Sequence, residues 1–297
     1  MYDLIIIGGG PAGITAGIYA ARKRLKTLLI TKDFIGQTGL TAAIENWPGE
    51  ESIGGPELME KFENHLRNND IEIVEDEVFS LGKEGDFFVK TDGGSFKSQA
   101  VILATGRRPK KLNVVGEKEF VGKGVVYCTT CDAPLFKDKR VIVVGGGNSG
   151  LESAIELTDY TEEILLFEAS PTLNGDEFLV EKAKEKGVEI FTNRKIKEIR
   201  GDGFVEKILF EELEKEEEML VDGIFIQIGS TPITDFIGDL VDFNKDGEVI
   251  VDPKTCRTRT EGLFAAGDLT DVRDKQIVVA TAEGAKAALS AYSYLKK

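Results

Sequence analysis

Two glycine-rich loops constrain the fold of this 297-residue chain more than any other feature. The first loop is Gly8–Gly13 and follows the apolar run Tyr2–Ile7, and the second is Gly145–Gly150 and follows Val141–Val144. Each loop stands between an expected strand and an expected helix, which is the context in which such loops bind a dinucleotide. Glycines let the backbone approach a pyrophosphate, and a helix N-terminus supplies N–H groups to it. The repeat therefore predicts an α/β fold with two Rossmann-like nucleotide-binding domains.

The residues after each loop complete the pattern. A helix from Ile14 to about Lys23 and a strand at Leu28–Ile30 follow the first loop, and a helix from Leu151 to about Thr158 and a strand at Ile164–Phe167 follow the second. Each set forms a strand–helix–strand unit of the expected length. Further expected segments are a strand ending at Ala104-Thr105-Gly106, a solvated linker at Arg107–Lys111, a solvated hairpin tip at Glu211–Glu218, a strand within Gly262–Asp268 and a helix over Ile277–Leu295.

A pair of cysteines, Cys128 and Cys131, lies between the two loops with two residues separating them. Half of a zinc site is one interpretation, but only Cys256 and His65 remain as further thiol or imidazole ligands, so a redox dithiol is favoured and no metal is expected. A helical turn opening at Cys131 would stabilise a thiolate there. Asp132 is a candidate proton donor and acceptor, or alternatively a helix cap. Cys256 is interpreted as a small structural residue.

An acidic residue distinguishes the two loops. Eighteen residues after Gly150 stands Glu168, directly behind a strand, where a carboxylate binds a ribose hydroxyl. The same count from Gly13 reaches Thr31. Glu168 would repel a 2′-phosphate, and the segment Ala169–Gly175 contains no Arg or Lys, so the second loop is expected to prefer NADH over NADPH. The alternative is an exposed glutamate with no role in ligand binding.

Composition excludes several classes of protein. The net charge of −15 argues against nucleic acid as a partner. The early apolar run is too short to span a membrane or to act as a secretory signal. Three cysteines do not form an extracellular disulfide framework, so we expect a cytoplasmic protein without membrane attachment.

With these motifs in order, the chain resembles the low-molecular-weight thioredoxin reductase family over nearly its whole length. The segments that carry the resemblance are Gly8–Gly13, Ile35–Gln37, Glu45–Gly49, Ala104–Gly106, Tyr127–Asp132, and Gly267-Asp268 followed by Gln276. The resemblance implies that FAD is held by Gly8, Gly10, Pro11, Ala12, Gly13, Gln37, Asn46, Ala104, Thr105, Gly106, Gly267, Asp268, Gln276 and Ile277. It places NAD(P)H at Gly145, Gly147, Asn148, Ser149, Gly150 and Glu168.

One stretch is closer to a neighbouring branch. Asp132–Lys137, Gly145–Gly150 and Leu166–Pro171 look like the flavoprotein subunit of bacterial alkyl hydroperoxide reductase, a branch that uses NADH. The basic NADPH motif of the thioredoxin reductases is absent, and Phe167-Glu168-Ala169 stands in its place. This departure argues against NADPH and leaves open a donor such as ferredoxin.

The resemblance also implies a domain plan and a reaction. A discontinuous FAD domain would comprise residues 1–111 and 242–297, and a pyridine-nucleotide domain at 112–241 would carry the dithiol. Electrons would pass from NAD(P)H through FAD to the Cys128–Cys131 disulfide, with Cys131 facing the flavin and Cys128 attacking the disulfide of a thioredoxin- or glutaredoxin-like protein. Asp132 would handle protons, and the enzyme would be a homodimer. The alternatives are a ferredoxin-reduced enzyme of the same fold, a peroxide-forming NADH oxidase and a non-catalytic flavin redox sensor.

Overall fold

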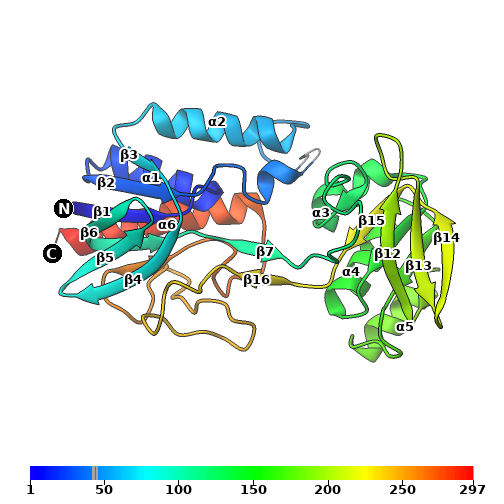
Figure 1. Cartoon of the computed structure of the whole chain (residues 1–297). Helices are drawn as coiled ribbons and strands as arrows, with labels where there is room; N and C mark the ends of the chain where they lie inside the picture. The colour runs from blue at the N-terminus through cyan, green and yellow to red at the C-terminus, as the bar shows by residue number, and fades with distance from the viewer. Residues whose placement is uncertain (42–43, 45, 297) are drawn as a thin grey trace. The chain divides into compact units, whose positions relative to one another are not determined.

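The chain divides into two compact units in a computed structural model that describes residues 1–41, 44 and 46–296 (Figure 1). Unit 1 comprises Met1–Gly39, Gly55–Arg108 and Thr231–Lys297, and unit 2 comprises Leu40–Gly54 and Pro109–Ser230. The division differs from the predicted domain bounds in three places. Residues 231–241 group with unit 1, whereas residues 109–111 and Leu40–Gly54 group with unit 2. The assignment of one cofactor to each unit remains a prediction.

Unit 1 is built on a seven-stranded sheet in the order β3-β2-β1-β6-β5-β4, with β17 also paired to β6. Strands β1, β2, β3, β17 and the second half of β6 run parallel, whereas β4 and β5 form an antiparallel hairpin beside β6. The strands are β1 (Tyr2–Ile7), β2 (Thr27–Thr31), β3 (Glu72–Glu75), β4 (Val78–Glu84), β5 (Asp86–Thr91), β6 (Gly94–Leu103) and β17 (Leu263–Ala265).

The central strands of unit 1 have continuous apolar runs at Leu4–Ile7, Leu28–Ile30 and Ala100–Leu103 because both faces of the sheet are covered there. Leu4 and Ile6 pack on the side of the helices, and Ile5 and Ile7 pack into a second core on the opposite face. The helices are α1 (Pro11–Arg22), the short η1 (Thr38–Leu40), α2 (Gly55–Arg67) and α6 (Ile277–Leu295), and α1 packs against both α2 and α6.

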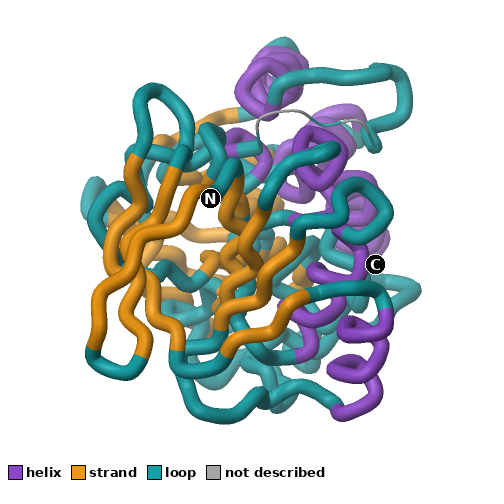
Figure 2. The backbone as a smooth tube through the Cα atoms, turned by 90° about the vertical axis from the view of Figure 1, so that its right-hand side faces the viewer, coloured by secondary structure: helices purple, strands orange, loops and turns teal. Residues whose placement is uncertain are grey.

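Unit 2 has the same plan at its centre. A five-stranded parallel sheet in the order β11-β10-β9-β15-β8 has helices on one face and a three-stranded antiparallel sheet on the other. Figure 2 shows the strands of the molecule in orange and its helices in purple. The elements of the parallel layer are β8 (Val125–Val126), β9 (Val141–Val144), β10 (Ile164–Phe167), β11 (Glu189–Phe191) and β15 (Gly223–Ile226). The others are α3 (Thr129–Asp132), η2 (Ala133–Phe136), α4 (Asn148–Leu157), α5 (Glu177–Glu185), β12 (Arg194–Arg200), β13 (Lys207–Glu212) and β14 (Lys215–Leu220).

The linker predicted at Arg107–Lys111 is more ordered than a solvated segment. Strand β7 (Arg107–Pro109) pairs with β16 (Ser230–Pro232), so two of the passages of the chain between the units form a two-stranded ribbon. The Arg107 side chain is only 12% exposed because its guanidinium lies 2.5 Å from a carboxylate oxygen of Glu248. A run of basic residues cannot by itself indicate such a distant ion-pair partner.

Two further expectations need correction. Both helices behind the glycine loops begin about three residues earlier than predicted, at Pro11 and Asn148, because the last loop residues already form the first helical turn. The acidic run Glu211–Glu218 is mostly strand rather than hairpin tip. The turn itself is Leu213-Glu214, both with positive φ, and the neighbouring acidic residues pair with basic ones across β12–β14.

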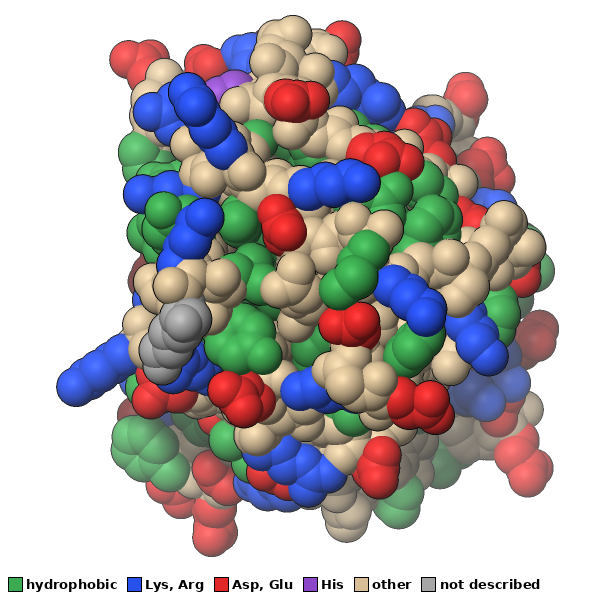
Figure 3. All heavy atoms as spheres, turned by 90° about the vertical axis from the view of Figure 1, so that its left-hand side faces the viewer, with side chains coloured by type: hydrophobic (Ala, Val, Ile, Leu, Met, Phe, Trp, Pro, Cys, Tyr) green, Lys and Arg blue, Asp and Glu red, His purple; other side chains and the backbone are tan. Residues whose placement is uncertain are grey.

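On the face seen in Figure 3, acidic and basic side chains are interspersed with apolar ones. Across the described residues, no helix is both long and apolar enough to span a membrane.

Candidate active site

The first glycine loop forms an open cradle at the end of β1. Gly8 has a φ of +117°, and its N–H donates to the carbonyl of Ile30 at 2.8 Å. A Cβ on Gly13 would lie 1.9 Å from the carbonyl oxygen of Gly8, so the loop closes tightly on its own helix. A Cβ on Gly10 would meet nothing within 4 Å, which leaves room in front of the N-terminus of α1. This open space at a helix N-terminus fits a pyrophosphate.

Most residues predicted to hold FAD lie at this same edge of the unit 1 sheet. Ala104–Gly106 follow β6 and Gly267 follows β17, and both strands run parallel to each other with β1 beside β6. A Cβ on Gly8 would lie 2.3 Å from the carbonyl oxygen of Ala104, and one on Gly267 would lie 3.0 Å from the Cβ of Ala12. The predicted residues gathered here are Gly8, Gly10, Pro11, Ala12, Gly13, Ala104, Thr105, Gly106, Gly267, Asp268, and Gln276 and Ile277 at the start of α6.

Two further predicted flavin residues lie on other segments. Gln37 is exposed on the turn after β2, which the Asp33 carboxylate holds by accepting from the N–H groups of Ile35 and Gly36. Asn46 belongs to the segment that groups with unit 2, and its predicted neighbour Glu45 lies outside the described residues. The roles of all these residues in flavin binding remain predictions.

Two carboxyl groups lie near this edge, the half-buried Asp268 and the buried Glu283. Burial raises the pKa of Asp268 and of Glu283, and the positive charge of Lys275 opposes the rise in both. Glu283, on α6, accepts a hydrogen bond from the N–H of Gly267 at 2.8 Å and so fixes the turn that carries Asp268. Sequence reasoning missed Glu283, because nothing in its local pattern indicates a contact sixteen residues back along the chain.

The second glycine loop repeats the first in unit 2. Gly145 has a φ of +124°, and its N–H donates to the carbonyl of Phe167 at 2.9 Å. A Cβ on Gly150 would lie 1.9 Å from the carbonyl oxygen of Gly145, and one on Gly147 would meet nothing within 4 Å. The N-terminus of α4 thus opens onto free space, as a second pyrophosphate site requires.

Glu168 lies at the end of β10, directly beside this loop. One carboxylate oxygen accepts from the N–H of Gly146 at 2.7 Å, and the other accepts from the N–H and hydroxyl of Ser170 at 2.8 and 2.7 Å. Burial alone would raise the pKa of Glu168, but these hydrogen bonds outweigh it and hold the pKa below its usual value. The group is therefore ionised at neutral pH and fixed at the loop.

The segment after Glu168 is fastened onto the loop. The N–H groups of Asn174 and Gly175 both donate to the carbonyl of Gly146, at 3.0 and 2.9 Å. Asn148, one of the predicted nucleotide residues, exchanges two hydrogen bonds with Asp176. The loop, the strand end and the following turn therefore form one assembly.

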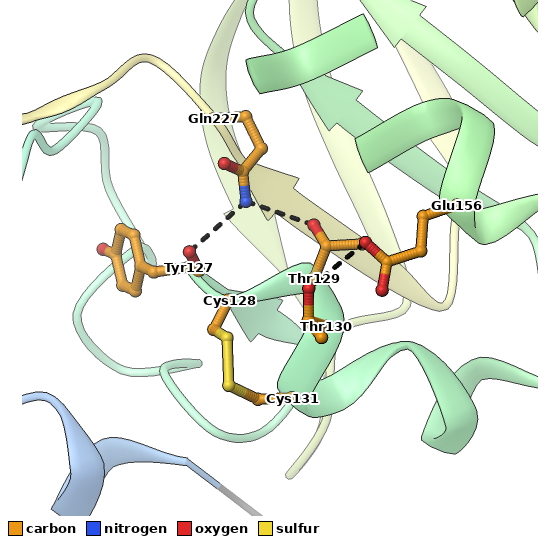
Figure 4. Close-up of a disulfide and its surroundings, with 7 residues drawn as sticks. All are labelled: Tyr127, Cys128, Thr129, Thr130, Cys131, Glu156 and Gln227. Carbon is orange, nitrogen blue, oxygen red and sulfur yellow. Dashed lines mark hydrogen bonds between the residues drawn. A yellow bond between two sulfur atoms is a disulfide. The ribbon is translucent and has the colours of Figure 1, made fainter. Parts of the chain in front are cut away.

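The Cys128–Cys131 pair is a disulfide in this structure, with Cα atoms 5.3 Å apart (Figure 4). The short helix α3 begins at Thr129 with Cys128 at its N-cap, so the helical turn opens at Cys128 and not at Cys131 as predicted. Asp132, the last residue of α3, is 4% exposed and donates its N–H to the carbonyl of Cys128. Because β8, β15 and β9 are parallel neighbours, the disulfide and the second glycine loop follow the same edge of one sheet.

Two residues that sequence reasoning missed hold the disulfide turn from either side (Figure 4). Gln227, just after β15, donates from its amide to the carbonyl of Tyr127 at 3.3 Å and to the hydroxyl of Thr129 at 3.2 Å. Glu156, on α4, accepts from the hydroxyl of Thr130 at 3.2 Å, and burial raises its pKa. No local pattern marks either residue, because each contact spans at least 26 positions in sequence.

The third cysteine has no part in this chemistry. Cys256 is a free thiol with no exposed surface, and burial raises its pKa to about 12. The prediction of a structural residue fits this environment, since an inert thiol is a buried and protonated one. Among the described residues, no group of three or more His, Cys, Asp and Glu could hold a metal ion.

Solved structures match the fold over nearly the whole chain. The thioredoxin reductase of Streptococcus pyogenes is 35% identical, with a TM-score of 0.95, and the match covers 100% of this chain and 98% of that one. Thioredoxin reductase from Giardia duodenalis is 34% identical, with a TM-score of 0.93 and coverage of 100% and 99%. The fold of this chain is therefore shared with solved thioredoxin reductases that are about a third identical to it in sequence.

Curated relatives point to the neighbouring branch. A subunit of the alkyl hydroperoxide reductase of Pseudomonas putida is 41% identical over 99% of this chain, and an NADH dehydrogenase of Bacillus subtilis is also 41% identical over 99%. This chain spans 58% of the length of each. The sequence pattern described as pyridine nucleotide-disulphide oxidoreductase matches residues 2–284. The chain therefore belongs to the pyridine nucleotide-disulphide oxidoreductases, a family of enzymes that use flavin and nicotinamide cofactors.

Proposed function

We propose that this chain is a flavin-dependent disulfide reductase that takes electrons from NADH and delivers them, through Cys128 and Cys131, to the disulfide of a small redox protein. The observation that carries the proposal is the disulfide at the same sheet edge as the second glycine loop. FAD, when bound, would supply a two-electron carrier between a nicotinamide and this disulfide. Reduction of the disulfide breaks its S–S bond and leaves two thiols, so two electrons and two protons enter the site.

The chain's own residues have distinct roles in this proposal. The open cradles at Gly10 and Gly147 receive the pyrophosphates of FAD and of the nicotinamide nucleotide. Cys131 faces the flavin and Cys128 attacks the partner's disulfide. Asp132, buried beside both, exchanges the protons that disulfide reduction requires.

The preference for NADH rests on the charges around Glu168. Its ionised carboxylate repels a 2′-phosphate. The backbone N–H of Arg194 donates to the carbonyl of Glu168. Its side chain is 12% exposed, and the guanidinium lies 3.7 Å from the centre of the Phe191 ring and pairs with Glu212 at 3.1 Å. This arginine is thus directed away from the position of a 2′-phosphate.

An anaerobic titration tests the donor. Purified holoenzyme is mixed with NADH or NADPH in separate cuvettes while the flavin absorbance is followed. We expect prompt bleaching by NADH, with uptake of enough electrons to reduce both flavin and disulfide. Bleaching by NADPH alone would contradict the role of Glu168, and bleaching by dithionite but by neither nucleotide would indicate a ferredoxin-type donor.

Single replacement of either cysteine tests the relay. Cys128→Ser and Cys131→Ser should each abolish reduction of a protein disulfide and leave FAD bound, because the thiols lie outside unit 1. The measurement is NADH oxidation coupled to reduction of a thioredoxin, with FAD content determined by absorbance. Oxidation of NADH that persists in both variants, with peroxide as the product, would indicate an oxidase instead.

The partner is inferred from the same chemistry. Thiol–disulfide exchange needs an accessible disulfide of matched potential, which thioredoxin- and glutaredoxin-like proteins carry. The names of the similar structures support a thioredoxin-like protein. Such partners work where thiols are kept reduced, so we place the enzyme in the cytoplasm.

A homodimer is also proposed, and the exposed face of α6 supports it. Val278 and Leu289 are 44% and 40% exposed, and Ala282 lies between them on the same face of a helix with few charges. We expect a dimer by sedimentation velocity that Leu289→Glu converts to a monomer. The matched control is Phe178→Glu, which places the same charge at an exposed position on α5. A monomeric wild-type protein would contradict the proposal.

A further inference from the structure

Gln227 contacts both the second glycine loop and the residues beside the Cys128–Cys131 disulfide. Its backbone N–H donates to the carbonyl of Val144 at 2.8 Å, at the entrance to the second glycine loop. Its carbonyl oxygen forms the wall of that loop, since a Cβ on Gly145 would lie 2.4 Å from it. The backbone of Gln227 is therefore fixed by the parallel sheet.

The side chain of Gln227 points the other way, toward the disulfide (Figure 4). Its amide nitrogen donates to the carbonyl of Tyr127 and to the hydroxyl of Thr129, the two residues that flank Cys128. Thr129 is 5% exposed, and Gln227 is half-buried. One side chain anchored on a rigid strand end thus holds the chain on both sides of a single cysteine.

We propose that Gln227 is a positioning residue for the dithiol, holding the backbone around Cys128 in the conformation that closes the bond to Cys131. The inference rests on the proposed function only in treating this disulfide as redox-active, and it requires neither the nicotinamide nucleotide nor the partner. We call the two hydrogen bonds from the Gln227 side chain the clamp. Because the clamp is present in the disulfide form, removing it is expected to favour the dithiol. One neutral hydrogen bond corresponds to about fivefold in an equilibrium constant, or roughly 20 mV for a two-electron couple.

The test measures the dithiol–disulfide equilibrium directly. Holoenzyme without NADH is equilibrated anaerobically in buffers of reduced and oxidised dithiothreitol, quenched with acid, unfolded and labelled with a maleimide for mass spectrometry. In the exchange the Cys128–Cys131 bond breaks and the ring disulfide of dithiothreitol forms, with its two thiol protons passing to the cysteines. Cys256 adds one constant label to every sample.

Two variants remove the clamp in different ways. Gln227→Leu removes the donor, and we expect the equilibrium to move at least fivefold toward the dithiol. Thr129→Val keeps the shape of the side chain and removes one of two acceptors, so we expect a smaller shift, of at least twofold, in the same direction. The double variant should shift no further than Gln227→Leu, because both changes remove the same hydrogen bond.

The matched control is Thr161→Val. Thr161 is 5% exposed and donates to the carbonyl of Lys139 in the same unit, so its loss costs a comparable hydrogen bond away from the disulfide. We expect lower stability and an unchanged equilibrium. The inference would be overturned if Gln227→Leu folds, contains FAD and has a dithiol–disulfide equilibrium constant within twofold of wild type. It would also be overturned if Thr161→Val shifts that constant by as much as Gln227→Leu does. If Gln227→Leu does not fold, an unshifted Thr129→Val overturns it.

The outcomes separate this inference from the proposed function. If Gln227→Leu shifts the dithiol–disulfide equilibrium but the wild-type protein takes no electrons from NADH, the positioning role is supported and the NADH proposal is contradicted. A wild-type disulfide that dithiothreitol does not reduce at any ratio would overturn both.

Discussion

The two glycine loops share a backbone geometry, whereas the strand ends beside them carry different side chains. Gly8 and Gly145 have φ values of +117° and +124°, and in both loops a Cβ on the last glycine would lie 1.9 Å from the first glycine's carbonyl oxygen. At the end of the next strand, however, the Thr31 hydroxyl donates to the nearby carbonyl of Asp33, whereas the Glu168 carboxylate accepts from the N–H of Gly146. The backbone cradle is repeated, and the side chain beside it distinguishes the two sites.

The largest expected effect comes from closing one cradle at a time. Gly13→Ala and Gly150→Ala each place a methyl group against a backbone carbonyl, at a cost on the order of 3 kcal/mol. We expect Gly13→Ala to lose FAD during purification. Gly150→Ala should retain FAD, and its reduction by NADH should slow about a hundredfold. Flavin absorbance and stopped-flow reduction measure the two effects.

The control for this pair is Gly82→Ala on β4, where a Cβ would meet nothing within 4 Å and φ is not positive. It should retain both FAD and NADH reduction. Loss of FAD from Gly150→Ala, with Gly13→Ala unaffected, would reverse the assignment of the two loops.

A smaller effect is expected when the second loop is given the side chain of the first. Glu168→Thr removes a charged acceptor, and such hydrogen bonds contribute roughly 1.5–3 kcal/mol, so the KM for NADH should rise at least about tenfold. The ratio of kcat/KM for NADPH to that for NADH should also rise, because the repulsion of a 2′-phosphate is gone. Steady-state kinetics with both nucleotides provide the measurement.

Thr31→Val is the matched control, since it changes the corresponding position of the first loop and should leave the KM for NADH unchanged. An unchanged KM in Glu168→Thr would assign the carboxylate to bracing the loop alone, without a role in ribose binding.

The smallest expected effects are opposite pH dependences of stability. The pKa of Glu168 is lowered, so its contribution is present above the ordinary glutamate pKa and is lost as the pH falls through the lower folded value. Glu168→Gln should therefore destabilise the protein at pH 7 and less so near pH 4. Urea unfolding of the flavin-free protein at both pH values measures the difference.

The contribution of Glu283 to stability should have the opposite pH dependence. Burial raises its pKa, so the stability present below the ordinary glutamate pKa is lost as the pH rises through the folded value. Glu283→Gln keeps an oxygen to accept from the N–H of Gly267 and removes the buried charge. We expect it to stabilise the protein at pH 7 and to have little effect near pH 4. If Glu168→Gln and Glu283→Gln both lower the free energy of unfolding at pH 7, the loss of hydrogen bonds and not the change of charge dominates.

Much of the fold could be predicted because its signals are local. Strands β1, β9 and β10 and helix α6 have the bounds expected from their apolar runs and helical spacing. The glycine loops can also be predicted from the sequence, because only glycine accepts the positive φ and the close backbone contact that both turns require.

The sequence by itself thus determined the α/β class, the two cradles, the dithiol between them and the acidic residue beside the second loop. The tertiary structure decided which distant side chains support them. Gln227 reaches Thr129 across 98 positions, and Arg107 reaches Glu248 across 141. Local patterns reflect backbone preferences over one or two turns, whereas these contacts depend on which strands become neighbours in a sheet, and that order is set only when the whole core packs.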